Sequence, residues 1–198
     1  MKKCLLNALL MSCLISSQAQ SFLYNVNFSG ANESPANGSP GTGLGTVLYD
    51  SLAHTLALNL SFAGLTGSTT ASHIHAATAS PFTGTAGVAT TTPTFAGFPL
   101  GVTSGSFANT LDLTLATSYN ASFITANGGT TASAEVALAG AMANGKAYWN
   151  IHTSTFGGGE IRGFLTPVPE PGTLALITLG GLGGAARIWN KRRASRKV

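Results

Sequence analysis

The chain has 198 residues and a formal net charge of +4, although only 8% of its residues are charged. The excess of basic residues lies near the C-terminus, because residues 21–165 contain two basic and five acidic side chains and carry a net charge of −3. This acidic body excludes the basic surface that nucleic-acid binding requires, so we expect no nucleic-acid partner. Cys4 and Cys13 are the only cysteines and both precede the body, which therefore has neither a disulfide nor a thiol nucleophile.

The first residues have the three parts of a signal peptide, and we assign residues 1–19 to it. Lys2-Lys3 forms a positive start, residues 4–15 form an apolar run too short for a permanent span, and small residues lead to a cleavage site near Ala19. A lipoprotein signal ending at Cys13 is the alternative, but the apolar run before that cysteine is short and the motif fits poorly. We therefore expect signal peptidase to release an exported body.

Alternating apolar residues predict half-buried strands in the body. The alternation has a period of two at residues 22–28, 56–62 and 111–115. Breaks rich in glycine and proline separate these stretches. The breaks lie at residues 29–45, 64–68, 81–87 and 93–105.

Two segments lack alternation and predict one or two short helices at 119–126 and 131–142. Thr130 or Thr131 can cap the second helix, and Asn144-Gly145 can end it. Its apolar residues lie close to helical spacing: Val136, Leu138, Ala139 and Met142. The predicted fold of residues 21–165 is therefore mainly all-β, an antiparallel β-sandwich or barrel with one or two inserted helices. A signal helix precedes this body and a transmembrane helix follows it.

Histidines and a polar hairpin stand out in this weakly charged sequence. In His73-Ile74-His75, strand geometry places both imidazoles on one face and Ile74 on the other. In residues 148–153, Trp149 and Ile151 share the core face, and the intervening residues share the opposite face. The glycine-rich loop 154–159 can return the chain as a hairpin.

The predicted hairpin pairs residues that face the same side of the two strands. If His152 lies opposite Glu160, then Asn150 meets Arg162, and Tyr148 meets Phe164. Ile161 and Leu165 then face the core while Glu160, Arg162 and Phe164 face away. One polar face would carry an acid, a base and an imidazole.

Three interpretations of this polar face remain open. In the first, four side chains hydrogen-bond to one another and lock the hairpin: Asn150, His152, Glu160 and Arg162. In the second, His73, His75 and His152 hold one zinc or copper ion, with Glu160 as a further ligand or as an acceptor that fixes the His152 tautomer. The third is hydrolysis, which we disfavour because the chain has no Gly-x-Ser-x-Gly motif and no evident carboxylate pair. We assign no catalytic residue, and a non-catalytic function is favoured over an enzymatic one.

The body resembles the CHRD domain, a module first described in the developmental regulator chordin and common in bacterial secreted proteins. The resemblance spans roughly residues 25–165. It rests on His73-Ile74-His75 and, far along the chain, on Asn150-Ile151-His152-Thr153 with Gly158-Gly159-Glu160-Ile161-Arg162-Gly163. The family supplies no settled biochemical activity to carry over.

The C-terminus contains a Pro-rich linker at 166–171, an apolar segment at 172–189 that is uncharged up to residue 186 and can cross a bilayer, and a basic tail at 190–198. The basic block lies at Arg187, Lys191, Arg192 and Arg193 and is expected on the cytoplasmic side. These features resemble the PEP-CTERM sorting signal of Gram-negative bacteria, whose motif corresponds to Val168-Pro169-Glu170-Pro171. An ordinary membrane anchor is the alternative, but it does not explain the Pro-Glu-Pro sequence.

The sorting signal implies an exosortase as the processing enzyme and the inner membrane as a transient anchor. We therefore expect an exported protein that first faces the periplasm and then reaches the cell surface or the extracellular matrix. Its body would be a non-catalytic binding or structural domain, with an exopolysaccharide or a surface protein as possible partner. The alternative is a metal-binding extracellular protein or enzyme that uses the three histidines.

Overall fold

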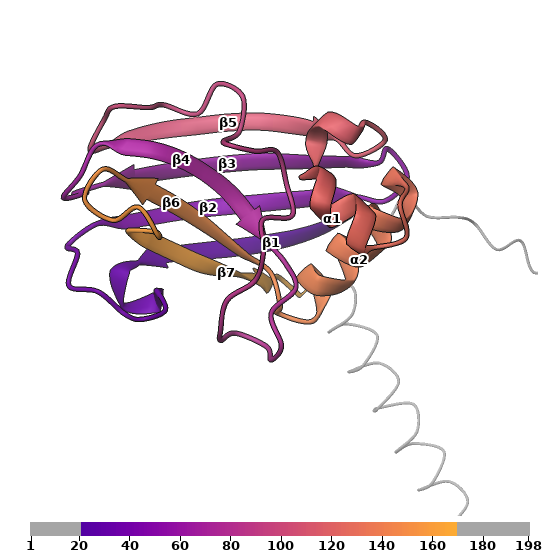
Figure 1. Cartoon of the computed structure of the whole chain (residues 1–198), viewed down its shortest axis with the longest axis horizontal. Helices are drawn as coiled ribbons and strands as arrows, with labels where there is room; N and C mark the ends of the chain where they lie inside the picture. Colours follow the sequence, from indigo (N-terminus) through magenta and orange to yellow (C-terminus); the bar gives the residue numbers. More distant parts are fainter. Residues whose placement is uncertain (1–20, 170–198) are drawn as a thin grey trace, which may run out of the picture.

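The computed structural model describes residues 21–169, which form a curled antiparallel sheet with helices at one end (Figure 1). Seven strands are joined in the order β4-β6-β7-β1-β2-β3-β5. The strands are β1 (Ser21–Ser29), β2 (Thr42–Asp50), β3 (Thr55–Ala63), β4 (Thr69–His75), β5 (Gly105–Asp112), β6 (Tyr148–Thr153) and β7 (Ile161–Pro167). The helices are α1 (Ala121–Ala126) and α2 (Thr131–Ala143), with short 3-10 turns at Gly30–Asn32 and Ala116–Ser118. The mainly β fold with short inserted helices is confirmed.

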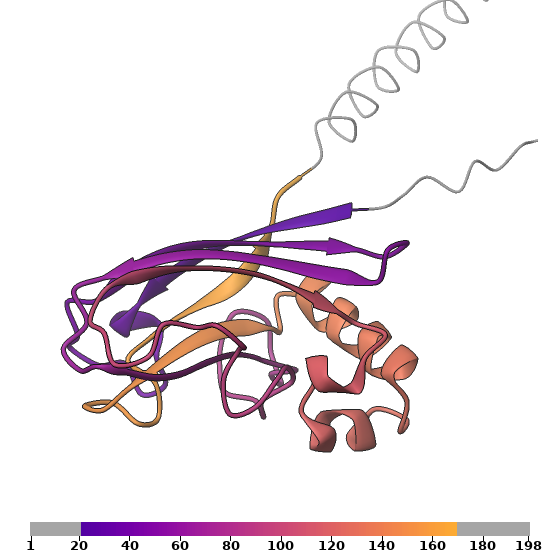
Figure 2. The ribbon, with the colours of Figure 1, turned by 90° about the horizontal axis from the view of Figure 1, so that it is seen from above.

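One sheet curls upon itself instead of forming two separate layers (Figure 2). The buried ring of Trp149 on β6 lies 5.6 Å from the ring of Phe28 on β1 and 6.3 Å from that of Phe107 on β5. Because β6 and β5 lie far apart in the strand order, this contact requires the sheet to close around a shared core. Phe95, in the connection from β4 to β5, packs against Trp149 at 5.8 Å. The connection lies beside β4, since Phe95 N donates to Ser72 O at 3.0 Å.

The predicted alternation is confirmed in β3 and, except for the exposed Phe22 at its start, in β1, where the apolar side chain at every second position enters the core. Tyr24, Val26 and Phe28 are buried in β1, and Leu56, Leu58, Leu60 and Phe62 are buried in β3. In the third stretch Leu111 is buried within β5. Leu113 and Leu115 both follow the last residue of β5, and of these two Leu113 is buried and Leu115 is exposed.

Strand β2 begins inside a segment that the sequence pattern assigned to a break. Two of the glycines that suggested the break, Gly43 and Gly45, lie in β2 and are required by close packing. A Cβ atom at Gly45 would lie 3.0 Å from Asn59 O and 3.3 Å from the ring of Phe28. Glycine thus marks close contacts within the sheet here instead of a turn.

Helix α2 begins and ends where the sequence predicts. The Thr130 side chain accepts from Ser133 N, and the Ser133 side chain accepts in return from Thr130 N, which forms a capping box. Gly145, with φ of 65°, follows the helix. Leu138 and Met142 are buried, whereas Val136, which its spacing groups with them, is 73% exposed.

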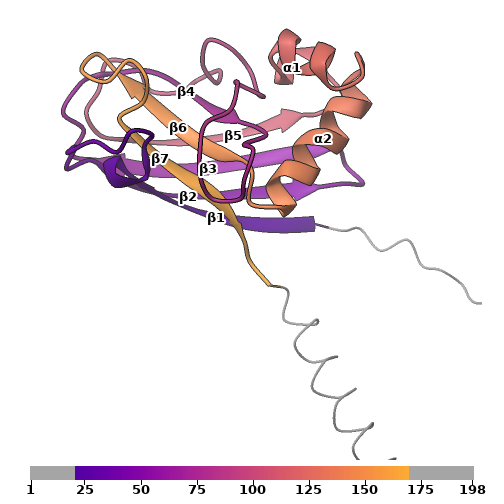
Figure 3. The same cartoon turned by 60° about the horizontal axis from the view of Figure 1, so that its bottom comes forward.

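Both ends of the described chain lie toward the end of the sheet that carries the helices (Figure 3). Ser21 pairs with Asp50, Asp50 with Thr55, and Thr55 with Asp112, so these residues lie in one row at that end. Pro167 of β7 pairs with Tyr24 near the start of β1. The predicted signal peptide, transmembrane helix and basic tail lie outside the described residues. Within residues 21–169, no helix is long and apolar enough to span a membrane.

Candidate metal centre

Strands β4, β6 and β7 are buried on both faces, unlike the rest of the sheet. Ile74, Trp149, Ile151 and Ile161 fill the core side with no exposed area. On the outer side, polar residues are also buried, and carbonyl groups of the loops at 30–39 and 76–93 contact them. These outer residues are His73, His75, Asn150 and Arg162.

The register of the hairpin agrees with the predicted pairs. Tyr148 lies opposite Phe164 and Asn150 lies opposite Arg162. On the other side of β6, His75 pairs with Tyr148 and His73 pairs with Asn150. The two histidines of β4 therefore occupy the same outer face as the polar residues of β6.

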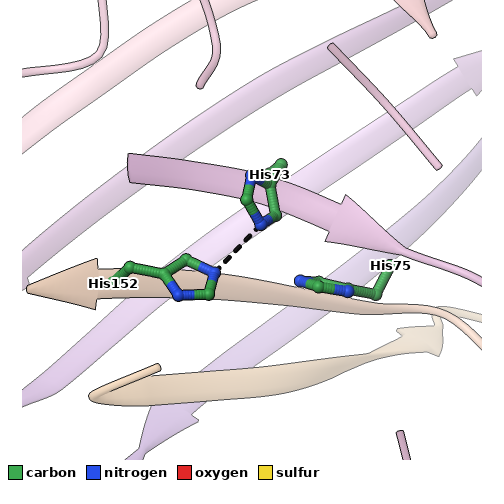
Figure 4. Close-up of side chains that lie close together, drawn as sticks. All are labelled: His73, His75 and His152. Carbon is green, nitrogen blue, oxygen red and sulfur yellow. Dashed lines mark hydrogen bonds between the residues drawn. The ribbon is translucent and has the colours of Figure 1, made fainter. Parts of the chain in front are cut away.

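Three imidazoles converge on this face (Figure 4). The Nε2 atoms of His73 and His152 are 2.9 Å apart. One nitrogen from each of His73, His75 and His152 lies within 4.8 Å of the corresponding nitrogens of the other two. The rings come from two neighbouring strands, so the strand pairing itself fixes their approach.

Backbone carbonyls determine the tautomer of each ring. The Nδ1 atoms of His73, His75 and His152 lie 3.1, 2.8 and 2.9 Å from the carbonyl oxygens of Pro93, Ala86 and Gly157, respectively. A carbonyl oxygen can only accept, so each Nδ1 carries a hydrogen and each neutral ring presents a lone pair at Nε2. The buried Nε2 of His75 has no hydrogen-bond partner among the described residues.

Without a cation, the Nε2 lone pairs of these three rings have no favourable partner. Two Nε2 lone pairs that face each other at 2.9 Å repel, and a proton or a metal ion between them removes the repulsion. Burial lowers the pKa of His73 and of His75 to about 4 and also lowers the pKa of His152. Near neutral pH the three rings are therefore uncharged, which is the form that binds metal ions.

Aromatic contacts hold the site in place. The ring of His75 stacks on Tyr148 with centroids 4.6 Å apart and an interplanar angle of 5°. The guanidinium of Arg162 lies 4.5 Å from the centre of the same tyrosine ring. Tyr148 is thus sandwiched between an imidazole and a cation, which restricts the rotamer of His75.

Glu160 does not lie beside the imidazoles. Its buried carboxylate accepts from the hydroxyls of Ser39 and Thr153, both at 2.6 Å, and from the backbone N–H groups of Thr66 and Gly67. Although burial raises its pKa, these hydrogen bonds outweigh that effect and hold the pKa of Glu160 below its ordinary value. Glu160 joins the end of the hairpin to two loops, and the Gly157 carbonyl takes the place expected for it beside His152.

The acid beside Arg162 is Glu33, which sequence reasoning missed. Glu33 Oε2 lies 3.8 Å from Arg162 Nε, and both side chains are almost fully buried. Arg162 also donates to the carbonyl oxygens of Asn32 and Gly84. The expected four-residue network is therefore divided, with Glu160 and Arg162 in separate clusters. In the sequence, Glu33 stands out only as the single charged residue of the predicted break at 29–45.

The family profile of the CHRD domain matches residues 24–165, which include the whole of this site. The chain belongs to the CHRD family. A second profile, the PEP-CTERM protein-sorting motif, matches residues 167–193. Comparisons with curated proteins and with solved structures find no match.

The sorting motif follows the CHRD domain directly. Val168 N donates to Leu23 O at 2.8 Å, so pairing with β1 continues into the motif. Pro169 is the last described residue, and Glu170, Pro171 and the basic tail lie outside the described range. The motif makes this CHRD protein an exported protein that is sorted through an exosortase.

Proposed function

We propose that this CHRD domain binds one zinc or copper ion through the Nε2 atoms of His73, His75 and His152 outside the inner membrane. The observation that carries the proposal is the convergence of three unprotonated Nε2 atoms, each in a ring whose Nδ1 donates to a backbone carbonyl. Hydrogen-bonded Nδ1 groups of this kind orient metal-binding histidines and set their tautomer.

The donor set points to a particular class of ion. Neutral imidazoles suit zinc and copper, whereas calcium and magnesium prefer oxygen ligands. The cluster found among residues 21–169 contains three histidines and no carboxylate. Three protein ligands leave a fourth tetrahedral position for water or another ligand.

The domain is proposed to act as a non-catalytic binding module. Glu160, the acid nearest in sequence to the site, already accepts four hydrogen bonds elsewhere, which leaves it poorly suited as a general base. The sorting motif supports a path in which the tail first anchors the protein in the inner membrane with the domain facing the periplasm. After the tail is processed, the domain would reach the cell surface or matrix and contact an exopolysaccharide or a surface protein.

Metal analysis of the purified chain tests the proposal. The protein is stripped with a chelator, reloaded with zinc or copper, and its bound metal is measured by mass spectrometry. We expect one ion per chain, lost in His73→Ala and in His152→Ala. Copper loading should also give the visible absorption of imidazole-bound Cu(II).

The fourth histidine provides a matched control. His54 lies outside the cluster, at the helix end of the sheet, where its Nδ1 is 2.9 Å from Glu135 Oε2. His54→Ala should keep the ion. Equal metal binding by wild type and His73→Ala, or equal loss in His54→Ala, would refute the three-histidine site.

A further inference from the structure

The position of the sorting motif limits how far the domain can lie from a membrane. Val168 still pairs with Leu23, and the apolar segment begins at Gly172, four residues later. A fully extended chain spans at most about 3.5 Å per residue, so four residues reach roughly 14 Å. While the tail is uncleaved, the end of the domain near Leu23 must therefore lie close to the bilayer.

Exposed apolar side chains gather at that same end. Nine large hydrophobic residues are exposed in the described chain, and five of them lie here, each 36% to 63% exposed. They are Phe22, Leu23, Leu48, Leu52 and Leu115, which we call the apolar end. Leu23 pairs with Leu48 across β1 and β2, and Leu52 lies in the turn between β2 and β3. Leu115 follows β5, whose last residue, Asp112, pairs with the first residue of β3.

The charges at the apolar end indicate which kind of lipid contact is possible. The carboxylates of the half-buried Asp50 and the exposed Asp112 cap the turns carrying Leu52 and Thr114. They disfavour attraction to anionic headgroups, so any contact must come from burial of the leucine and phenylalanine side chains.

We propose that the apolar end rests on the lipid bilayer while the sorting tail is uncleaved, with Leu52 and Leu115 in the interfacial region. This inference rests on the membrane anchoring proposed above. It also places the metal centre away from the bilayer. Arg162 beside the centre pairs with Ser29, six residues along β1 from Leu23, which corresponds to about 20 Å at the rise of a strand. The loop after His152 lies farther from the apolar end.

Lipid quenching in the full chain tests the proposal. A single cysteine is introduced as Leu52→Cys, Leu115→Cys or, as control, Gly158→Cys in the loop beside the metal centre, in a chain carrying Cys4→Ser and Cys13→Ser. Each site receives an environment-sensitive fluorophore, and the chain is reconstituted in phosphatidylethanolamine vesicles containing nitroxide lipids. Gly158 is a suitable control, because a side chain there meets no atom within 4 Å.

We expect several-fold stronger quenching at positions 52 and 115 than at 158, and no loss of quenching at high salt. Adding phosphatidylglycerol should weaken the quenching at position 52. Equal quenching at all three sites, or none at 52 and 115 in chains that float with the vesicles, would overturn the inference. Chains that fail to float would refute the membrane anchoring itself, and with it the contact.

Discussion

The outer face of the single curled sheet has two unlike halves. Over β4, β6 and β7 it is covered by loops and carries buried histidines, an arginine and Asn150. Over β1, β2, β3 and β5 it is open, and it is uncharged apart from Asp50 and Asp112 in the row at the helix end. Register aligns its residues in three rows across the four strands: Leu23, Leu48, Ala57 and Thr110; Asn25, Thr46, Asn59 and Ala108; Asn27, Leu44, Ser61 and Ser106.

The two halves differ in what a polar side chain requires. On the open half, water satisfies every amide and hydroxyl, so the identity of the residue matters little. On the covered half each polar atom needs a protein partner or a ligand. Four buried side-chain atoms in residues 21–169 have no hydrogen-bond partner, and three of them belong to the covered half: His75 Nε2, Asn150 Oδ1 and Glu33 Oε1. Unsatisfied polar atoms thus concentrate where the candidate site lies.

The largest difference between the halves should appear on removal of Glu160. Glu160→Ala leaves the backbone N–H groups of Thr66 and Gly67 and two hydroxyls without their acceptor, so we expect a loss of about 3 kcal/mol in the free energy of unfolding. Urea unfolding followed by tryptophan fluorescence measures it. The matched change on the open half, Asn59→Ala, should shift the unfolding free energy by less than about 0.5 kcal/mol. Similar losses in both variants would contradict the distinction.

Lowering the pH should reduce the free energy of unfolding in the wild type for the same reason, because it removes the charge of Glu160. The folded-state pKa of Glu160 lies below its ordinary value, so its contribution is present above the pKa of the unfolded chain. As the pH falls through the folded-state value, the carboxylate is protonated and this contribution is lost. Glu160→Gln should therefore reduce the acid sensitivity of the unfolding free energy.

The sequence predicted strand alternation and hairpin register well, but it did not predict which loops cover the outer face of the sheet. Strand alternation placed Trp149, Ile151 and Ile161 in the core, and hairpin register followed from the return at 154–159. The burial of His73 and His75 depends on loops whose path no periodicity specifies. Glu160 departed from its expected side because it directly follows Gly159, with φ of 129°, and strand pairing begins only at Ile161. Glu33 reaches Arg162 across 129 positions of the chain, a contact with no local signature.

Glu33, a second acid of the covered half, should affect the free energy of unfolding with a pH dependence opposite to that of Glu160. Burial raises the pKa of Glu33 to about 7, although Arg162 opposes the shift. A raised pKa means that the stabilising contribution is fully present below the ordinary value of 4.5 and is lost as the pH rises through about 7.

Glu33→Gln should remove this loss, because the amide stays neutral at every pH. We expect the variant to gain about 1 kcal/mol relative to wild type above pH 7, after allowance for solvent screening, and to gain nothing below pH 4.5. Urea unfolding across that range provides the test. A parallel pH dependence in both proteins would show that Glu33 is not the group responsible.

The smallest effect should come from the most exposed large apolar residue of the open half. Leu44 is 67% exposed and lies between Asn27 and Ser61 in its row. Leu44→Thr places a β-branched side chain on a pleated surface and buries no new polar atom, so the free energy of unfolding should change by less than about 0.5 kcal/mol. A loss well above that value would mean that a second surface covers the open half in solution, and sedimentation velocity would then reveal self-association that Leu44→Thr abolishes. In that case the open half would be exposed only in the monomer, and the two halves would both be covered in the associated protein.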